Sequence, residues 1–182
     1  MDDNIKSWNI IAHEYDALIM RGDFFREQLL NPAVNALLPY LNGKRILDAG
    51  CGQGYFSADM HTKGATVIGV DASENLIEIA KERYPESDSL TFFVHDLKKP
   101  LTFFSGSFDG VISNMVLMDF DPIDCAVSEL GRVTKTGGFF IFSILHPFFV
   151  SGAVRKNFSE LLQGQLPHYE LSQYTTPFRK DW

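Results

Sequence analysis

Five short apolar segments alternate with segments of helical periodicity between residues 44 and 145. Strands that are apolar throughout and separated by helices are typical of a parallel sheet with both faces covered. Because crossovers between parallel strands are right-handed, this order predicts an α/β fold: a Rossmann-like doubly wound, mostly parallel sheet with helices on both faces. The expected strands are Lys44–Asp48, Thr66–Val70, Thr91–Val94, Phe108–Ser113 and Phe139–Leu145.

The helices of this pattern carry recognisable start signals. Ser73 is a capping residue, and Asn31-Pro32 and Asp121-Pro122 each place a capping side chain before a proline at the first helical position. The expected helices cover residues 5–20, 32–40, 55–61, 74–83 and 122–133.

Charge and cysteine content exclude several classes of protein. The formal net charge is -7 and the basic residues are scattered, whereas nucleic-acid binding needs clustered lysine and arginine, so we expect no nucleic-acid partner. Cys51 and Cys125 are too few for a disulfide framework and form no C-x-x-C pair, so we expect no metal site. The start of the chain is unlike a signal peptide, and no apolar run reaches the roughly 20 residues that span a bilayer. A cytoplasmic protein without a membrane partner is therefore expected.

Polar or glycine residues follow every expected strand at its carboxyl end. Ligands of doubly wound sheets bind outside these ends, so we expect the residues to converge on one crevice. They are Asp48 with the glycine loop 50–54, Asp71, His95-Asp96, Asn114 and His146.

The loop after the first strand carries Gly50, Gly52 and Gly54, which permit a sharp turn and a close approach to a ligand. An ordinary tight turn is the alternative interpretation. Dinucleotide-binding turns read G-x-G-x-x-G, and here the third glycine of that pattern is replaced by Tyr55, which would obstruct close packing. Asp48 would attract a ligand ammonium and repel a pyrophosphate, so the loop favours a zwitterionic ligand over NAD.

The carboxylates at the ends of two further strands suit the ribose and the adenine of a nucleotide ligand. Asp71 can accept hydrogen bonds from both hydroxyls of a ribose. Its alternative role, starting a helix, is one that Ser73 can fill. Asp96 can accept a hydrogen bond from an adenine amino group, whereas His95 is equally well explained as a structural surface histidine.

Several sequence blocks together resemble one known family. ILDAGCGQG (residues 46–54), VIGVDAS (67–73) and VHDL (94–97) are similar to the first motif, the acidic second motif and the adenine-side aspartate of class I S-adenosylmethionine-dependent methyltransferases. FDGVISNMVLMDF and LGRVTKTGGFFIFSILHP resemble their fourth-strand and fifth-strand blocks. The resemblance covers residues 42–147 in the right order, and it is nearest to small-molecule methyltransferases of types 11 and 25.

This resemblance implies S-adenosyl-L-methionine as the cofactor and S-adenosyl-L-homocysteine as its product. It places Asp71 at the ribose, His95 and Asp96 at the adenine, and Ala72 and Leu97 at the base as apolar or backbone contacts. The residues implied at the methionine portion and the sulfonium are Asp48, Gly50, Cys51, Gly52, Gly54, Asn114 and Met115.

The N-terminal part resembles a helical cover over the cofactor. The W-x6-YD motif is matched by Trp8 and Tyr15-Asp16, and the GD-x2-R motif by Gly22-Asp23 and Arg26. This resemblance places Tyr15 at the cofactor. A plain amphipathic helix packed on the sheet is an equally good interpretation.

One domain, residues 1–182, is expected, with a cover (1–41), a cofactor-binding core (42–147) and a lid or incomplete C-terminal segment (148–182). Class I domains close with an antiparallel strand pair after the fifth strand, and the segment after Pro147 is too short for it. We therefore expect the C-terminal part of the sheet to be truncated, and the unpaired edge favours a homodimer.

Methyl transfer from a sulfonium needs positioning and exclusion of water more than a dedicated acid or base. His146 is the candidate general base, with a helix cap or a pocket wall as its competing role. The chain lacks the [DNS]-P-P-[YFW] pattern associated with amino methylation of nucleobases or glutamine, and it has no Pro-Cys nucleophile for cytosine-C5 chemistry. Together with the acidic net charge, this leads us to expect a small, apolar or aromatic acceptor. Two alternatives stay open: an S-adenosylmethionine-binding module without turnover, and a nicotinamide-dependent oxidoreductase, which the glycine spacing disfavours.

Overall fold

The computed structural model describes residues 3–120, 122–145, 154–156 and 169–171. The chain divides into two compact units, Met1–Ile144 and Leu145–Trp182. In the second unit, β6 (Val154–Lys156) and β7 (Tyr169–Leu171) form an antiparallel pair. The sheet predicted from the sequence lies in the first unit.

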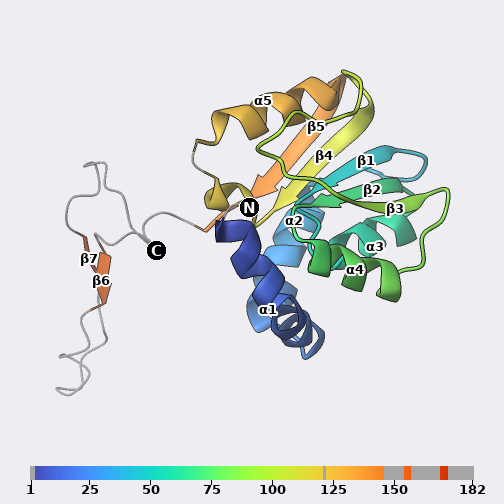
Figure 1. Ribbon diagram of the computed structural model, residues 1–182. Helices are drawn as coiled ribbons and strands as arrows, with labels where there is room; N and C mark the ends of the chain where they lie inside the picture. The colour runs from blue at the N-terminus through green and yellow to red at the C-terminus, as the bar shows by residue number, and fades with distance from the viewer. Residues whose placement is uncertain (1–2, 121, 146–153, 157–168, 172–182) are drawn as a thin grey trace. The chain divides into compact units, whose positions relative to one another are not determined.

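Five strands form that sheet, and all of them are parallel (Figure 1). Their order is β3-β2-β1-β4-β5, so the chain moves outward from β1 in one direction and then from β4 in the other. This is the doubly wound arrangement, and the predicted fold class is confirmed. The strands are β1 (Arg45–Ala49), β2 (Thr66–Asp71), β3 (Leu90–Val94), β4 (Phe108–Asn114) and β5 (Thr134–Ser143).

Helices cover both faces of the sheet. Side chains alternate along β1, so Ile46 joins a core beneath α2, α3 and α4, while Leu47 joins a second core beneath α5. Figure 1 shows α5 on one side of the sheet and α3 and α4 on the other. The helical segments are α1 (Asp3–Met20), the π-helical turn η1 (Arg26–Leu30), α2 (Asn31–Leu37), α3 (Tyr55–Thr62), α4 (Glu74–Arg83), the 3-10 turn η2 (Leu117–Asp119) and α5 (Asp124–Val133).

The helix starts differ in one respect from those predicted. Ser73 caps α4 as expected, since its Oγ accepts a hydrogen bond from the Leu76 amide at 3.2 Å. The prediction that Asn31 caps α2 is wrong, because α2 continues directly from η1 and has Leu30 at its cap position. Asn31 is instead buried, and its Nδ2 donates to the Tyr55 hydroxyl at 3.1 Å. The predicted cap Asp121 lies outside the described residues, and α5 begins at Asp124.

Strand β5 is longer at its start than predicted. The strand was expected to begin at Phe139, but Gly137 and Gly138, which precede it, lie inside β5 at a register shift against β4. Gly110 of β4 is opposite that shift, and a Cβ there would lie 2.2 Å from the Phe139 ring. The glycines therefore form a bulge, which lets an aromatic side chain cross the neighbouring strand.

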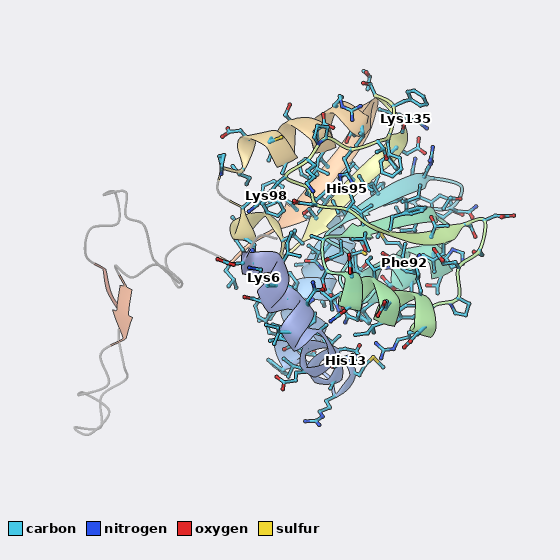
Figure 2. The ribbon with its side chains drawn as sticks, in the orientation of Figure 1. Lys6, His13, Phe92, His95, Lys98 and Lys135 are labelled. Carbon is cyan, nitrogen blue, oxygen red and sulfur yellow. The ribbon has the colours of Figure 1, made fainter. Side chains whose placement is uncertain are left out.

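Apolar packing around Phe92 gives a first prediction. Phe92 is fully buried between β3 and α4 (Figure 2), so Phe92→Ala should lower the free energy of unfolding by about 3–5 kcal/mol. Urea titration monitored by circular dichroism measures the change. Phe104→Ala is the matched control: this ring is 87% exposed, and its loss should cost at most about 0.5 kcal/mol. Equal losses from the two variants would contradict the core described above.

Candidate cofactor site

A cavity lies at the carboxyl ends of β1, β2, β3 and β4. Its lining comes from the residues that follow these four strands and from α1, which Figure 1 shows next to the strand ends. Residues far apart in the sequence are thus brought together where doubly wound sheets bind ligands. The lining residues that the sequence predicted are Tyr15, Gly50, Gly52, Asp71, Ala72, His95, Asp96, Leu97, Asn114 and Met115.

The glycine loop after β1 turns tightly enough to lie against the end of β4. Gly50, Gly52 and Gly54 have φ angles of 83°, 54° and 82°, which other residues rarely adopt. A Cβ at Gly50 would lie 2.3 Å from Cγ2 of Val116, so the close approach requires glycine. The loop backbone can therefore line the cavity directly.

The carboxylate of Asp71 joins this loop to the start of α4. Its Oδ2 accepts a hydrogen bond from the Gly52 amide and its Oδ1 from the Ser73 amide, both at 2.9 Å. Burial raises the pKa of this carboxyl, and the backbone hydrogen bonds from Ser73, Gly52 and Ala72 oppose that rise. A carboxylate oxygen can accept more than one hydrogen bond, so Asp71 retains capacity for a ligand diol.

The segment after β3 forms another side of the cavity. The His95 amide donates to the carbonyl of Asp71 at 2.8 Å, which holds the segment beside the end of β2. Oδ1 of Asp96 accepts a hydrogen bond from the Lys98 amide at 3.0 Å, so its other oxygen keeps acceptor capacity toward a ligand amino group. Figure 2 labels His95 and Lys98 on this segment.

Backbone strain marks the end of β4. Among the described residues, Met115 is the one non-glycine residue with a positive φ, at 62°. Its amide donates to both the carbonyl and the hydroxyl oxygen of Ser143, each at 3.0 Å, and the Ser143 hydroxyl donates to Oδ1 of Asn114 at 2.5 Å. Such conformations persist where neighbouring contacts enforce them, and they concentrate at functional sites.

Three predicted residues, Asp48, Cys51 and Gly54, are not among the residues that line the cavity. Asp48 is 1% exposed, and the Ser57 hydroxyl donates to its Oδ2 at 2.5 Å. Burial raises the pKa of Asp48 to about 7 and also raises the pKa of the Cys51 thiol. Gly54 faces the Phe92 ring in the core. Direct contact between these three residues and a cofactor stays a prediction.

The candidate general base, His146, lies outside the described residues. Its role in proton removal therefore also stays a prediction.

Helix α1 covers one side of the cavity with Trp8 and Tyr15, whose rings meet edge to face at 5.3 Å. The Arg26 guanidinium donates to the Tyr15 hydroxyl, so the two N-terminal motifs contact each other. Side-chain contacts to α4 also hold α1 in place: Arg83 forms a two-point ion pair with Asp16.

Asn9 adds a second attachment of α1. Its side-chain oxygen accepts from the Ser73 hydroxyl at 2.7 Å, and its carbonyl accepts from Nδ2 of Asn75 at 2.8 Å. Polar contacts therefore fix this helix to the start of α4, while its role as a cover over the cofactor stays a prediction.

Several lining residues were missed by the sequence analysis. Asp119 and Phe120 follow β4 by a few residues, so their place after a strand end was a usable signal. Asn4 and Ile5 carried no such signal, because their spacing fits any amphipathic helix. The unassigned lining residues are Asn4, Ile5, Ser73, Leu76, Lys98, Val116, Asp119 and Phe120.

A parallel sheet with a glycine loop after β1 and a carboxylate at the end of β2 defines a nucleotide-cofactor-binding domain. A family model described as a methyltransferase domain matches residues 47–142, which is more than half of the chain. The chain belongs to this family, the class I S-adenosylmethionine-dependent methyltransferases. S-adenosylmethionine is therefore its cofactor, as the sequence predicted.

Individual relatives agree with this assignment. The chain is 38% identical over 100 residues to a malonyl-[acyl-carrier protein] O-methyltransferase of Buchnera aphidicola, covering 55% of this chain and 39% of that protein. It is 35% identical over 100 residues to a magnesium-protoporphyrin O-methyltransferase of Rhodobacter capsulatus, covering 53% and 43%. The chain thus spans about two fifths of the length of these curated relatives.

Solved structures show the same fold. An S-adenosylmethionine-dependent methyltransferase from Mesorhizobium loti superposes with a TM-score of 0.71 at 30% identity, covering 80% of this chain and 65% of that one. A Haloferax volcanii methyltransferase, solved in complex with the Trm112 activator and described as putative, gives 0.64 at 26% identity, covering 75% and 58%.

None of the helices in the described part of the chain has the length and apolarity that crossing a bilayer requires. The cytoplasmic location, the absence of a nucleic-acid partner and the homodimer stay predictions.

The buried Asp48 gives a pH-dependent prediction. Its pKa is about 7 in the folded chain and near 3.8 when exposed, so folding favours the protonated form. The stability that the protonated Asp48 carboxyl contributes is therefore complete below about pH 4, and it is lost as the pH rises toward 7. Asp48→Asn, which stays neutral, should be more stable than wild type at pH 8, by several kcal/mol as an order of magnitude.

This difference should shrink between pH 7 and pH 4. Urea titrations of both proteins at several pH values measure it, with Asp88→Asn as the control at an exposed carboxylate. A difference that stays constant across this range would contradict the raised pKa.

Proposed function

We propose that the chain transfers a methyl group from S-adenosylmethionine, bound in the cavity described above, to a small-molecule acceptor. The observation that carries this proposal is the single cavity that joins Gly50 and Gly52, Asp71, Asp96 and Met115 from four strand ends. These positions offer the donors, acceptors and close backbone approach that the parts of the cofactor require.

The residues present fit the cofactor part by part. The Asp71 carboxylate suits the two ribose hydroxyls, and Asp96 suits the adenine amino group. The glycine loop, where a Cβ at Gly50 would collide with Val116, suits the methionine portion. Asn114 and Met115 would border the sulfonium at the end of β4.

When bound, the cofactor supplies an activated methyl group, so the protein needs to orient and desolvate the reactants. Placing them in line can lower the barrier by about 7–11 kcal/mol. Trp8 and Tyr15 of α1 line the cavity beside the strand ends and would exclude water there. The acceptor lone pair forms the new bond to the methyl carbon, while the electron pair of the broken carbon–sulfur bond stays on sulfur.

The names of two relatives give malonyl-[acyl-carrier protein] and magnesium-protoporphyrin as their acceptors, and the second of these supports a small-molecule acceptor. We extend the proposal to the organisation of the chain. Residues 42–147 form the cofactor-binding core, residues 1–41 form its cover, and residues 148–182 form a lid or incomplete C-terminal segment. His146 is proposed as the general base.

Calorimetric titration of the 182-residue chain with S-adenosylhomocysteine, with NAD as the control ligand, tests the cofactor site. We expect binding of the first ligand alone, with a Kd of about 1–100 μM. Absence of binding by a folded sample would overturn the proposal. Binding without methyl transfer to any acceptor in a broad panel would favour the cofactor-binding module without turnover.

The role of Asp71 is tested separately. Asp71→Ala removes a charged acceptor from the ribose position, so affinity for S-adenosylhomocysteine should fall about 10–100-fold. Asp88→Ala removes an exposed aspartate away from the cavity, and its affinity should match the wild type. Calorimetry on samples with equal circular dichroism spectra measures both, and an unchanged affinity in Asp71→Ala would remove this residue from the site.

A further inference from the structure

The cavity extends beyond the residues that the cofactor accounts for. After Met115 the chain makes the turn η2, and Asp119 and Phe120 at its end line the same cavity. Trp8 of α1 lines it as well. Asp119 and Phe120 are not among the residues that we assign to the ribose, the adenine or the methionine portion, so we assign this part of the cavity to the acceptor.

Asp119 is held in place by two hydrogen bonds from α1. The Trp8 side chain donates to the Asp119 carboxylate, and Nδ2 of Asn4 donates to the Asp119 carbonyl at 3.2 Å. The carboxyl is half-buried, and burial raises its pKa despite the bond from Trp8. Among the ion pairs of the described residues, none joins Asp119 to a lysine or arginine.

This carboxylate therefore has a fixed position, a half-buried environment and unused acceptor capacity. A carboxylate can accept about four hydrogen bonds, and one from Trp8 leaves several for a ligand. An ammonium or amine N–H is the natural partner, because charge-assisted hydrogen bonds are strong where water is excluded.

The surroundings of Asp119 also favour a cation. The negative charge of Asp119 raises the pKa of the Asp71 carboxyl, and both side chains line the same cavity. The ring of Phe120 already has the Lys98 ammonium 5.8 Å from its centroid, and aromatic faces attract cations. Of the charged residues that line the cavity, Asp71, Asp96 and Asp119 are carboxylates and Lys98 is a cation, so the net charge of the lining opposes an anionic acceptor.

We propose that Asp119 receives the methyl acceptor and that the acceptor is a small amine, held between the Asp119 carboxylate and the rings of Trp8 and Phe120. This inference rests on the proposed function and names its acceptor class. It distinguishes the chain from the O-methyltransferases to which it is similar, because it predicts transfer to nitrogen.

Proton transfer precedes methyl transfer. The acceptor ammonium gives one proton to the Asp119 carboxylate, which becomes neutral and leaves the amine nitrogen with a lone pair. That lone pair bonds to the methyl carbon, and the electrons of the carbon–sulfur bond remain on sulfur. The product leaves as a methylammonium ion, and the proton on Asp119 passes to solvent.

Two sets of three probes test the acceptor class, and the probes within a set share one skeleton. The first set is 2-phenylethylamine, 3-phenylpropanoate and 2-phenylethanol. The second set is tryptamine, indole-3-propanoate and tryptophol. Each is titrated calorimetrically into the 182-residue chain saturated with S-adenosylhomocysteine, and methyl transfer is followed by mass spectrometry with S-adenosylmethionine. In at least one set, the amine should bind about tenfold or more tightly than its carboxylate partner and should be the one methylated.

Asp119→Asn should reduce that preference to about threefold or less, because the charge is lost while the shape is kept. Asp119→Glu should restore part of it, and Asp88→Asn should leave it unchanged. Affinity for S-adenosylhomocysteine is measured for every variant in the same titrations, so that a change in the cofactor site is separated from a change in the acceptor preference.

Two results would overturn the proposal: amines that bind no more tightly than their carboxylate partners in both sets, or an amine preference that persists in Asp119→Asn. Failure of the proposed function gives a different result, because the wild-type chain would then not bind S-adenosylhomocysteine at all.

Discussion

The carboxylate of Asp71 connects two loops that belong to different strands. It accepts hydrogen bonds from Gly52, in the loop after β1, and from Ser73, at the start of α4. Parallel pairing of β1 with β2 brings these loops to the same edge of the sheet, and Asp71 then fixes their distance. Because Ser73 also bonds to Asn9 of α1, the position of the cover depends on the same carboxylate.

The buried carboxylates near this edge of the sheet lower the stability of the chain when no ligand is bound. Asp48 and Asp71 are both affected by burial, and each meets the charge of another aspartate, so their pKa values rise. A ligand that carries a sulfonium and an ammonium would offset this repulsion. A cationic acceptor at Asp119, in the same cavity, would offset the repulsion between carboxylates in the same way.

Much of the fold could be predicted because it depends on local patterns. The five strands, the Ser73 cap and the turn of the glycine loop follow from apolar runs and residue types with strong local preferences. The predictions were wrong where packing overrides such preferences. Asn31 lies in a helix that continues from a π-helical turn, and Gly137 lies in a bulge because β5 pairs further along β4 than its apolar run suggests.

The sequence by itself determined the parallel sheet, the family and the set of strand-end residues, because periodicity and motif spacing are properties of the linear chain. The tertiary structure decided which of those residues share one cavity. It buried Asp48 against Ser57 of α3 and brought Trp8 to Asp119 across more than a hundred residues. Such contacts depend on how helices pack over strand ends, and no local pattern encodes that packing.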